Sequence, residues 1–107
     1  MIKKFGTLYA GHVDFDDIGF AATAANDRRM TNEKLVTAYD KAEAIARLVD
    51  RTGFDTFWMA EHHFQHEGYE AIPNILMLAT YLAGKTENIR FGCGFNVATM
   101  WHPIRLP

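Results

Sequence analysis

The stretch GFDTFWMAEHHF, residues 53–64, decides the fold. Gly53 suits the left-handed position at the end of a helix. Residues 54–60 follow, and their continuous apolar run 57–60 predicts a strand buried on both faces of a parallel sheet. One acidic residue and two histidines, Glu61–His63, come where that strand ends. Because ligands bind at the carboxyl ends of strands in open α/β folds and in parallel barrels, this polar cluster is a candidate active site.

Four further segments have the composition or the periodicity of regular elements. They are strands over residues 4–9 and 89–95, a helix from Thr31 or Asn32 to Arg51, and a helix over residues 75–83 with Pro73 in its first turn and Gly84 as its stop. In the first helix, apolar residues recur at intervals of four and three, which places them on one face. The order strand, helix, strand, helix, strand predicts parallel strands joined by crossovers, with the helices on one side of the sheet.

The loops that follow the predicted strands, residues 10–30, 61–72 and 96–103, then share one face. The first loop is long and has no clear period, so we expect it to be functional or disordered. Three strands cannot close a barrel and would leave two open edges. We therefore expect residues 1–107 to be the N-terminal portion of a larger α/β domain, with no internal domain boundary, and to lack activity on their own.

Composition and charge exclude several classes of function. The net charge of -2 gives no reason to expect nucleic acid or an anionic membrane surface as a partner. The longest apolar run, residues 75–83, has nine residues and is too short to span a membrane, and the N-terminus has no signal-peptide pattern. The one cysteine, Cys93, cannot form an internal disulfide and is expected to be a small buried packing residue. These features predict a cytoplasmic protein.

The residues alone leave the chemistry of Glu61–His63 open. Neighbouring residues on a strand point to opposite faces, so His62 and His63 are badly placed to share one metal ion, and we expect no metal site. A general acid or base needs one imidazole that faces a cleft, and Glu61 could orient such a ring. Alternatively, both histidines are ordinary polar residues that close the end of a strand.

The aromatic residues and the glycine-rich third strand have simple structural interpretations. Residues 92–95, GCGF, do not have the spacing of a phosphate-binding loop and are expected to allow close packing. We expect the aromatic side chains in and near the strands to be core: Phe57, Trp58, Phe64, Phe95 and Trp101.

Residues 53–64 resemble a Gly-Phe-Asp-x-x-Trp-x-x-Glu-His-His-Phe run in the bacterial luciferase-like flavin-dependent monooxygenases. Residues 4–6, 89–92 and 102–105 are similar to other parts of the same family. The resemblance implies a (β/α)₈ TIM barrel that uses reduced FMN and molecular oxygen to oxidise a small organic substrate through a flavin C4a-peroxide. An F420-dependent hydride-transfer enzyme of the same fold and a non-catalytic partner subunit are alternatives.

The resemblance also implies roles for particular residues and partners. His62 matches the catalytic base, while Glu61, His63 and Trp101 would shape the substrate or flavin pocket. Gly94 and Phe95 match the place where the family has a non-proline cis peptide bond against the flavin. The basic residue that grips the FMN phosphate would lie beyond residue 107. A separate flavin reductase and a homo- or heterodimer are the expected protein partners.

Overall fold

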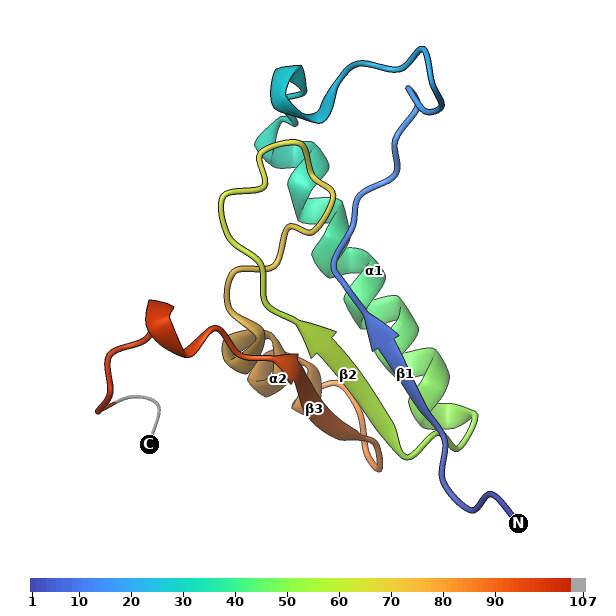
Figure 1. Ribbon diagram of the computed structural model, residues 1–107. Helices are drawn as coiled ribbons and strands as arrows, with labels where there is room; N and C mark the ends of the chain where they lie inside the picture. Colours follow the sequence, from blue (N-terminus) through green and yellow to red (C-terminus); the bar gives the residue numbers. More distant parts are fainter. Residues whose placement is uncertain (105–107) are drawn as a thin grey trace.

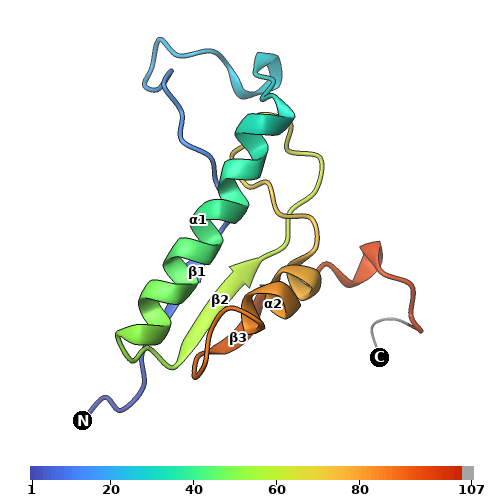
Figure 2. The same cartoon turned by 180° about the vertical axis from the view of Figure 1, so that it is seen from behind.

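The computed structural model describes residues 1–104, which form an open parallel sheet with two helices on one face. The strands β1 (Gly6–Tyr9), β2 (Thr56–Ala60) and β3 (Arg90–Phe95) lie in the order β1-β2-β3, with both pairings parallel (Figure 1). Figure 2, seen from behind, has the helices α1 (Asn32–Arg51) and α2 (Ile75–Ala83) in front of the sheet. The predicted element order, the parallel pairing and the one-sided helix layer are therefore confirmed.

Local signals set both ends of α1. The Thr31 side chain accepts a hydrogen bond from the Lys34 amide at 3.3 Å, which caps the first turn. At the other end Gly53 has φ 82°, and the amides of Gly53 and Phe54 donate to the carbonyls of Asp50 and Val49 at 3.2 and 2.9 Å. This pair of bonds is the Schellman arrangement, which satisfies carbonyls that the helix leaves free. The predicted boundaries and the left-handed Gly53 are confirmed.

The helix α2 also has the predicted range, but its first turn is built differently. The Asn74 side chain accepts from the Met77 amide at 2.9 Å, so Asn74 is the cap and Pro73 lies before the helix. The prediction of Pro73 in the first turn is wrong, because an asparagine side chain satisfies a helix-terminal amide directly. Gly84 ends the helix, as predicted.

The core lies between the helices and the sheet. Phe57 and Met59 of β2 are fully buried, and they meet the buried residues Ala42 and Ala46 of α1 and Leu82 of α2 in a single cluster. The hydroxyl of the buried Tyr9 donates to the Ala38 carbonyl at 2.6 Å, and burial raises the pKa of Tyr9 to about 12. The sheet is therefore attached to α1 through apolar contacts and a buried polar one.

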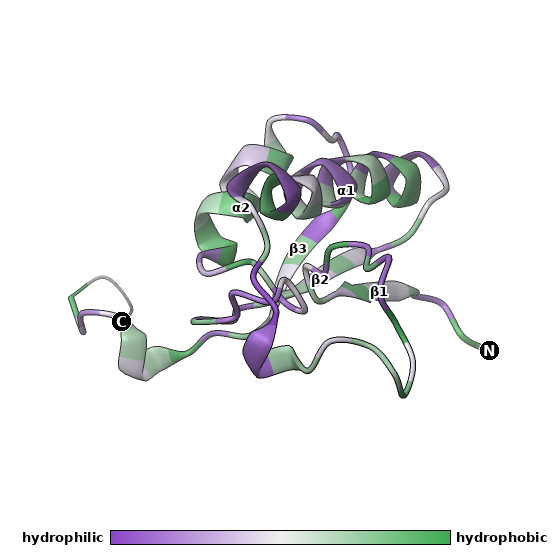
Figure 3. Ribbon diagram, turned by 90° about the horizontal axis from the view of Figure 1, so that it is seen from above, coloured by the Kyte–Doolittle hydropathy of each residue, from purple (hydrophilic) through white to green (hydrophobic). Residues whose placement is uncertain are grey.

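The opposite face of the sheet has no covering layer among the described residues (Figure 3). Trp58 is 44% exposed and Phe95 is 74% exposed, and Phe64 and Cys93 are also exposed. The predictions of a β2 buried on both faces, of core positions for these three aromatic residues and of a buried Cys93 are wrong. The physical reason is that helices cover one face only and β3 is an edge strand.

The loop over residues 10–30 is attached to the rest of the chain by charged side chains. Asp14 pairs with Lys41 at 2.6 Å, and Asp16 pairs with Lys34 at 3.5 Å, both on α1. Apart from a short 3₁₀ helix, Ala25–Asp27, the loop is irregular, as expected. At the other end of the sheet, both carboxylate oxygens of Asp50 accept from the amides of residues 87–89 at 2.8–2.9 Å and so join α1 to the turn before β3.

Residues 1–104 contain two complete strand–helix units and a third strand, followed by a second 3₁₀ helix, Ala98–Met100. Arg105, the last residue of the 102–105 resemblance, lies outside the described residues. No helix in the described part of the chain is long and apolar enough to cross a membrane.

Candidate active site

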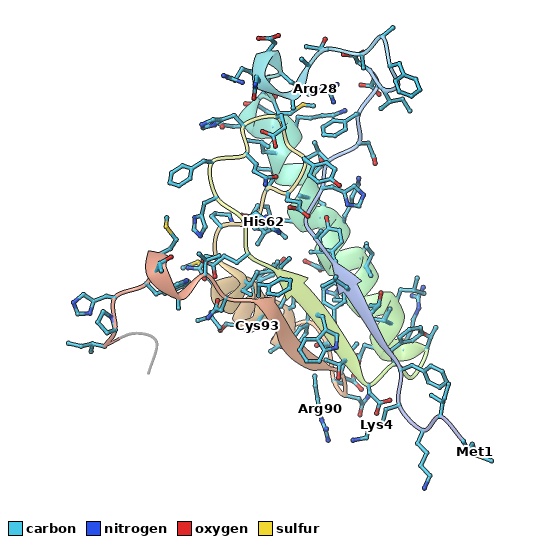
Figure 4. All side chains as sticks on the ribbon, in the orientation of Figure 1. Met1, Lys4, Arg28, His62, Arg90 and Cys93 are labelled. Atoms are coloured by element: carbon cyan, nitrogen blue, oxygen red, sulfur yellow. The ribbon has the colours of Figure 1, made fainter. Side chains whose placement is uncertain are left out.

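The loops that follow the three strands meet at one end of the sheet, as predicted. Figure 4 shows His62 just beyond the end of β2, whereas Lys4 and Arg90 lie at the opposite end of the strands. The amide of Glu61 donates to the Phe95 carbonyl at 3.3 Å, so the carboxyl ends of β2 and β3 remain adjacent. This end of the sheet is where a parallel α/β fold binds ligands.

Glu61 is the centre of a buried polar cluster. The residue is only 2% exposed, and its side chain accepts the Trp101 indole N–H at 2.8 Å on Oε1 and at 3.1 Å on Oε2. His63 Nε2 lies 2.7 Å from Oε1, and the Val97 amide donates to Oε2 at 3.4 Å. Burying a carboxylate is costly unless its oxygens are hydrogen-bonded, and these three donors meet that requirement. The cluster joins the loop after β2 to the loop after β3.

His62 belongs to a second, separate group. Its Nδ1 lies 2.8 Å from Oε2 of Glu70, and the two side chains are 28% and 20% exposed. Glu61, which was expected to orient one of the two rings, contacts the His63 ring and not the His62 ring. Glu70 was missed from the sequence, since nothing in an eight-residue spacing within an irregular loop indicates such a contact.

Phe64 has the backbone conformation of a strained residue. Its φ of 63° lies in the left-handed region, where a bulky side chain is an outlier, and its ring lies 6.0 Å from the His63 ring. Backbone strain of this kind costs about 1–3 kcal/mol and concentrates at ligand-binding sites. The turn at Phe64 sends the chain away from β2 immediately after the two histidines.

The end of β3 has an irregular geometry. The β2–β3 register shifts after Met59 so that Ala60 pairs with Phe95, and Gly94 is left between the paired positions. A Cβ on Gly94 would lie 3.0 Å from the Met59 carbonyl oxygen and 3.1 Å from the Leu8 side chain. The Gly94–Phe95 peptide bond is trans, like the others in residues 1–104, which corrects the expectation of a cis bond here. Asn96, the next residue, has a buried Oδ1 without a hydrogen-bond partner in the described part of the chain.

The predicted site residues thus fall into three groups: Glu61 with His63 and Trp101; His62 with Glu70; and Gly94 with Phe95. His63 and Trp101 also line a cavity of about 220 Å³ that His62 does not enter. The two neighbouring imidazoles have different carboxylate partners and do not converge. Within residues 1–104 no group of three His, Cys, Asp or Glu side chains is placed to hold a metal ion.

Sequence comparison shows which family this chain belongs to. The sequence model of the luciferase-like monooxygenases matches residues 17–106, so the chain belongs to the luciferase-like monooxygenase family. The oxygenase component of the flavin-dependent trigonelline monooxygenase of Acinetobacter baylyi is 37% identical over 68 residues, which are 64% of this chain and 18% of that protein. The alkanal monooxygenase alpha chain of Photorhabdus laumondii is 36% identical over 61 residues, 57% of this chain and 16% of that protein.

Solved structures share the fold. The crystal structure of apo-MsnO8 superposes with a TM-score of 0.66 and 26% identity, over 96% of this chain and 26% of that one. The oxygenating constituent of 3,6-diketocamphane monooxygenase from Pseudomonas putida, solved with FMN, gives a TM-score of 0.67 at 22% identity over 96% of this chain and 23% of that one. The chain therefore spans less than a fifth of these curated relatives and about a quarter of these structures.

Proposed function

We propose that this chain is part of a flavin-dependent monooxygenase that uses reduced FMN and molecular oxygen to oxidise a small organic substrate in the cytoplasm. On this proposal, residues 1–107 supply the first strands of a (β/α)₈ barrel, and His62 is the catalytic base. The observation that carries the proposal is the partly exposed His62 imidazole at the carboxyl end of the central strand, in a sheet whose uncovered face exposes apolar side chains. Membership of the luciferase-like monooxygenase family supports the same class of reaction.

The residues around the end of β3 fit the ring system of a flavin. Gly94 has no side chain, and Leu8 and Phe95 expose apolar surface of the kind that binds a planar heteroaromatic ring. The Oδ1 of Asn96, which has no hydrogen-bond partner within residues 1–104, is an acceptor, and the ring N–H groups of reduced FMN are donors that would satisfy it. We therefore assign Gly94, Phe95 and Asn96 to the flavin ring. No residue of 1–104 is assigned to its phosphate.

The proposed roles follow from the contacts. Bound reduced FMN would supply the electrons that activate oxygen. His62 would take a proton from the substrate at Nε2, since Nδ1 faces Glu70. Exposed Phe64 and Phe95 would form apolar walls that exclude water from this proton transfer. Glu61, His63 and Trp101 would hold the two loops in a fixed geometry and so shape the pocket.

The proposed partners rest on the relatives. The Acinetobacter baylyi protein is called an oxygenase component, which supports a separate reductase that delivers reduced FMN to this protein as well. We also propose a homo- or heterodimer. The substrate would be a small organic molecule of the kinds that these relatives oxidise, such as an aldehyde or a heteroaromatic acid.

The test uses the full-length protein with a flavin reductase, FMN or F420, and a panel of candidate substrates. We expect FMN binding by fluorescence titration and substrate-dependent oxygen consumption. The variant His62→Ala should lower turnover by about 10²–10⁴-fold, the usual contribution of a general base. The matched control is His66→Ala, an exposed imidazole in the same loop, which should keep wild-type turnover.

Three results would contradict the proposal. Wild-type turnover in His62→Ala would remove the assigned base. Hydride transfer with F420 and no oxygen consumption would identify the deazaflavin enzyme instead. Failure to bind either cofactor would identify a non-catalytic partner subunit.

A further inference from the structure

Backbone hydrogen bonds to a neighbouring loop fix the position of Glu70. On its N-terminal side, the Gly68 carbonyl accepts from the Val13 amide at 3.0 Å. On its C-terminal side, the Ala71 amide donates to the Gly11 carbonyl at 2.8 Å. The backbone around Glu70 is therefore held from both sides by the loop that follows β1.

The same segment is tied to His62 itself. The His62 amide donates to the Ile72 carbonyl at 2.9 Å, and the Ile72 side chain is fully buried. Close packing leaves little freedom here, because a Cβ on Gly11 would lie 2.6 Å from Ile72. A Cβ on Gly68 would likewise lie 2.6 Å from Val13. Two glycines without side chains thus allow the loop to return and place Glu70 against the His62 ring.

We propose that Glu70 is a positioning residue that holds His62 in one tautomer and one orientation. One of its carboxylate oxygens lies 2.8 Å from Nδ1, which is close enough to accept the Nδ1–H of the neutral ring. An imidazole whose Nδ1 carries the proton has its lone pair on Nε2, so the second nitrogen is the one that can accept a proton. Within residues 1–104 no group bonds to Nε2. The inference rests on the proposed function, in which His62 is the base.

Glu70 also explains why the two adjacent histidines differ. Both rings have a carboxylate partner, but Glu61 meets His63 at Nε2 whereas Glu70 meets His62 at Nδ1. The Glu61 contact uses the outer nitrogen of His63 and ties that ring to a buried cluster. The Glu70 contact uses the nitrogen nearer the backbone and leaves the outer nitrogen of His62 for a ligand. Carboxylate partners that fix a ring tautomer in this way raise the efficiency of the histidine that they orient.

The experiment measures the tautomer of His62 directly in the ¹⁵N-labelled full-length protein. Long-range proton–nitrogen correlation spectra distinguish Nδ1–H from Nε2–H, and the missing signals of His62→Ala assign the ring. We expect Nδ1–H in the wild type, a loss of that preference in Glu70→Ala, and its retention in Glu70→Gln, whose amide oxygen still accepts. The control is Glu67→Ala, a carboxylate of the same loop for which residues 1–104 supply no hydrogen-bond or ion-pair partner.

Turnover supplies the second readout. We expect kcat to fall by about 10–100-fold in Glu70→Ala, less than for His62→Ala, with KM changed by less than about twofold. Glu70→Gln should recover much of this loss, and Glu70→Leu, which fills similar space without an acceptor, replaces Glu70→Ala if that variant fails to fold. An unchanged tautomer in a folded Glu70→Ala overturns the role of Glu70 even where His62→Ala abolishes turnover. Wild-type turnover in His62→Ala instead overturns the proposed base, whatever tautomer the spectra report.

Discussion

The contact between the buried Glu61 and the half-buried Trp101 should couple the loops after β2 and β3 energetically. The indole N–H of Trp101 reaches both oxygens of the carboxylate, at 2.8 and 3.1 Å, across 40 residues of sequence. In Glu61→Gln an NH₂ group replaces one oxygen. The Trp101 indole N–H approaches both carboxylate oxygens of the wild type. The NH₂ group of the glutamine would therefore face an N–H donor in either of the two orientations of the side-chain amide. In Trp101→Phe the ring stays aromatic but the donor is lost.

The size of the effect follows from these contacts. A hydrogen bond to a charged group contributes about 1.5–3 kcal/mol, and a buried donor left unpaired costs about 1–3 kcal/mol. We therefore expect each single variant to lower the free energy of unfolding by about 1.5–3 kcal/mol. The double variant should lose about 1–2 kcal/mol less than the sum, because removing the indole donor relieves the conflict that the glutamine creates.

The assay is urea denaturation of the four full-length proteins, with hydrogen exchange of residues 96–101 as a local measurement. Equal m-values across the set would show that the compared states are the same. Val36→Ala is the control, because Val36 is exposed on α1 and has no part in the cluster. Single-variant effects that add to within about 0.5 kcal/mol would refute the coupling.

Two further predictions concern the loops and the helix that support the site. Gly68→Ala should lower the free energy of unfolding by about 2–5 kcal/mol in denaturation experiments, because this position combines a left-handed φ with clashes against two side chains. Gly53→Ala has the same φ of 82° but open space around it, so it should lower the free energy of unfolding by only about 1–2 kcal/mol. Equal losses in the two variants would contradict this reasoning. The backbone amides of residues 87–89 hold the pKa of Asp50 below its usual value of 3.8. A carboxyl whose pKa is lower in the folded state stabilises the fold at pH values above its unfolded-state pKa. The difference in free energy of unfolding between wild type and Asp50→Asn should therefore be constant above about pH 5 and shrink as the pH falls below about 4. A difference that grows in acid would contradict the assignment.

The two helices could be read from the sequence because their signals are local. A capping threonine, a left-handed glycine and apolar residues at intervals of three and four act within a few residues of each other, and α1 has the predicted bounds. Exposure could not be predicted in the same way. An apolar run such as residues 57–60 has the same composition whether one or both faces of the sheet are covered, so Trp58 and Cys93 were placed wrongly.

By itself, the sequence determined the order of elements along the chain, the parallel pairing of the strands, the polar cluster at the end of β2 and, through its Glu-His-His-Phe motif, the family. Only the tertiary structure decided the partner of each histidine. Successive side chains diverge where a strand ends, so neighbours in sequence are not neighbours in space. The Glu70 contact depends on backbone hydrogen bonds between loops about 60 residues apart, such as Ala71 to Gly11, and no local pattern encodes a contact of that range.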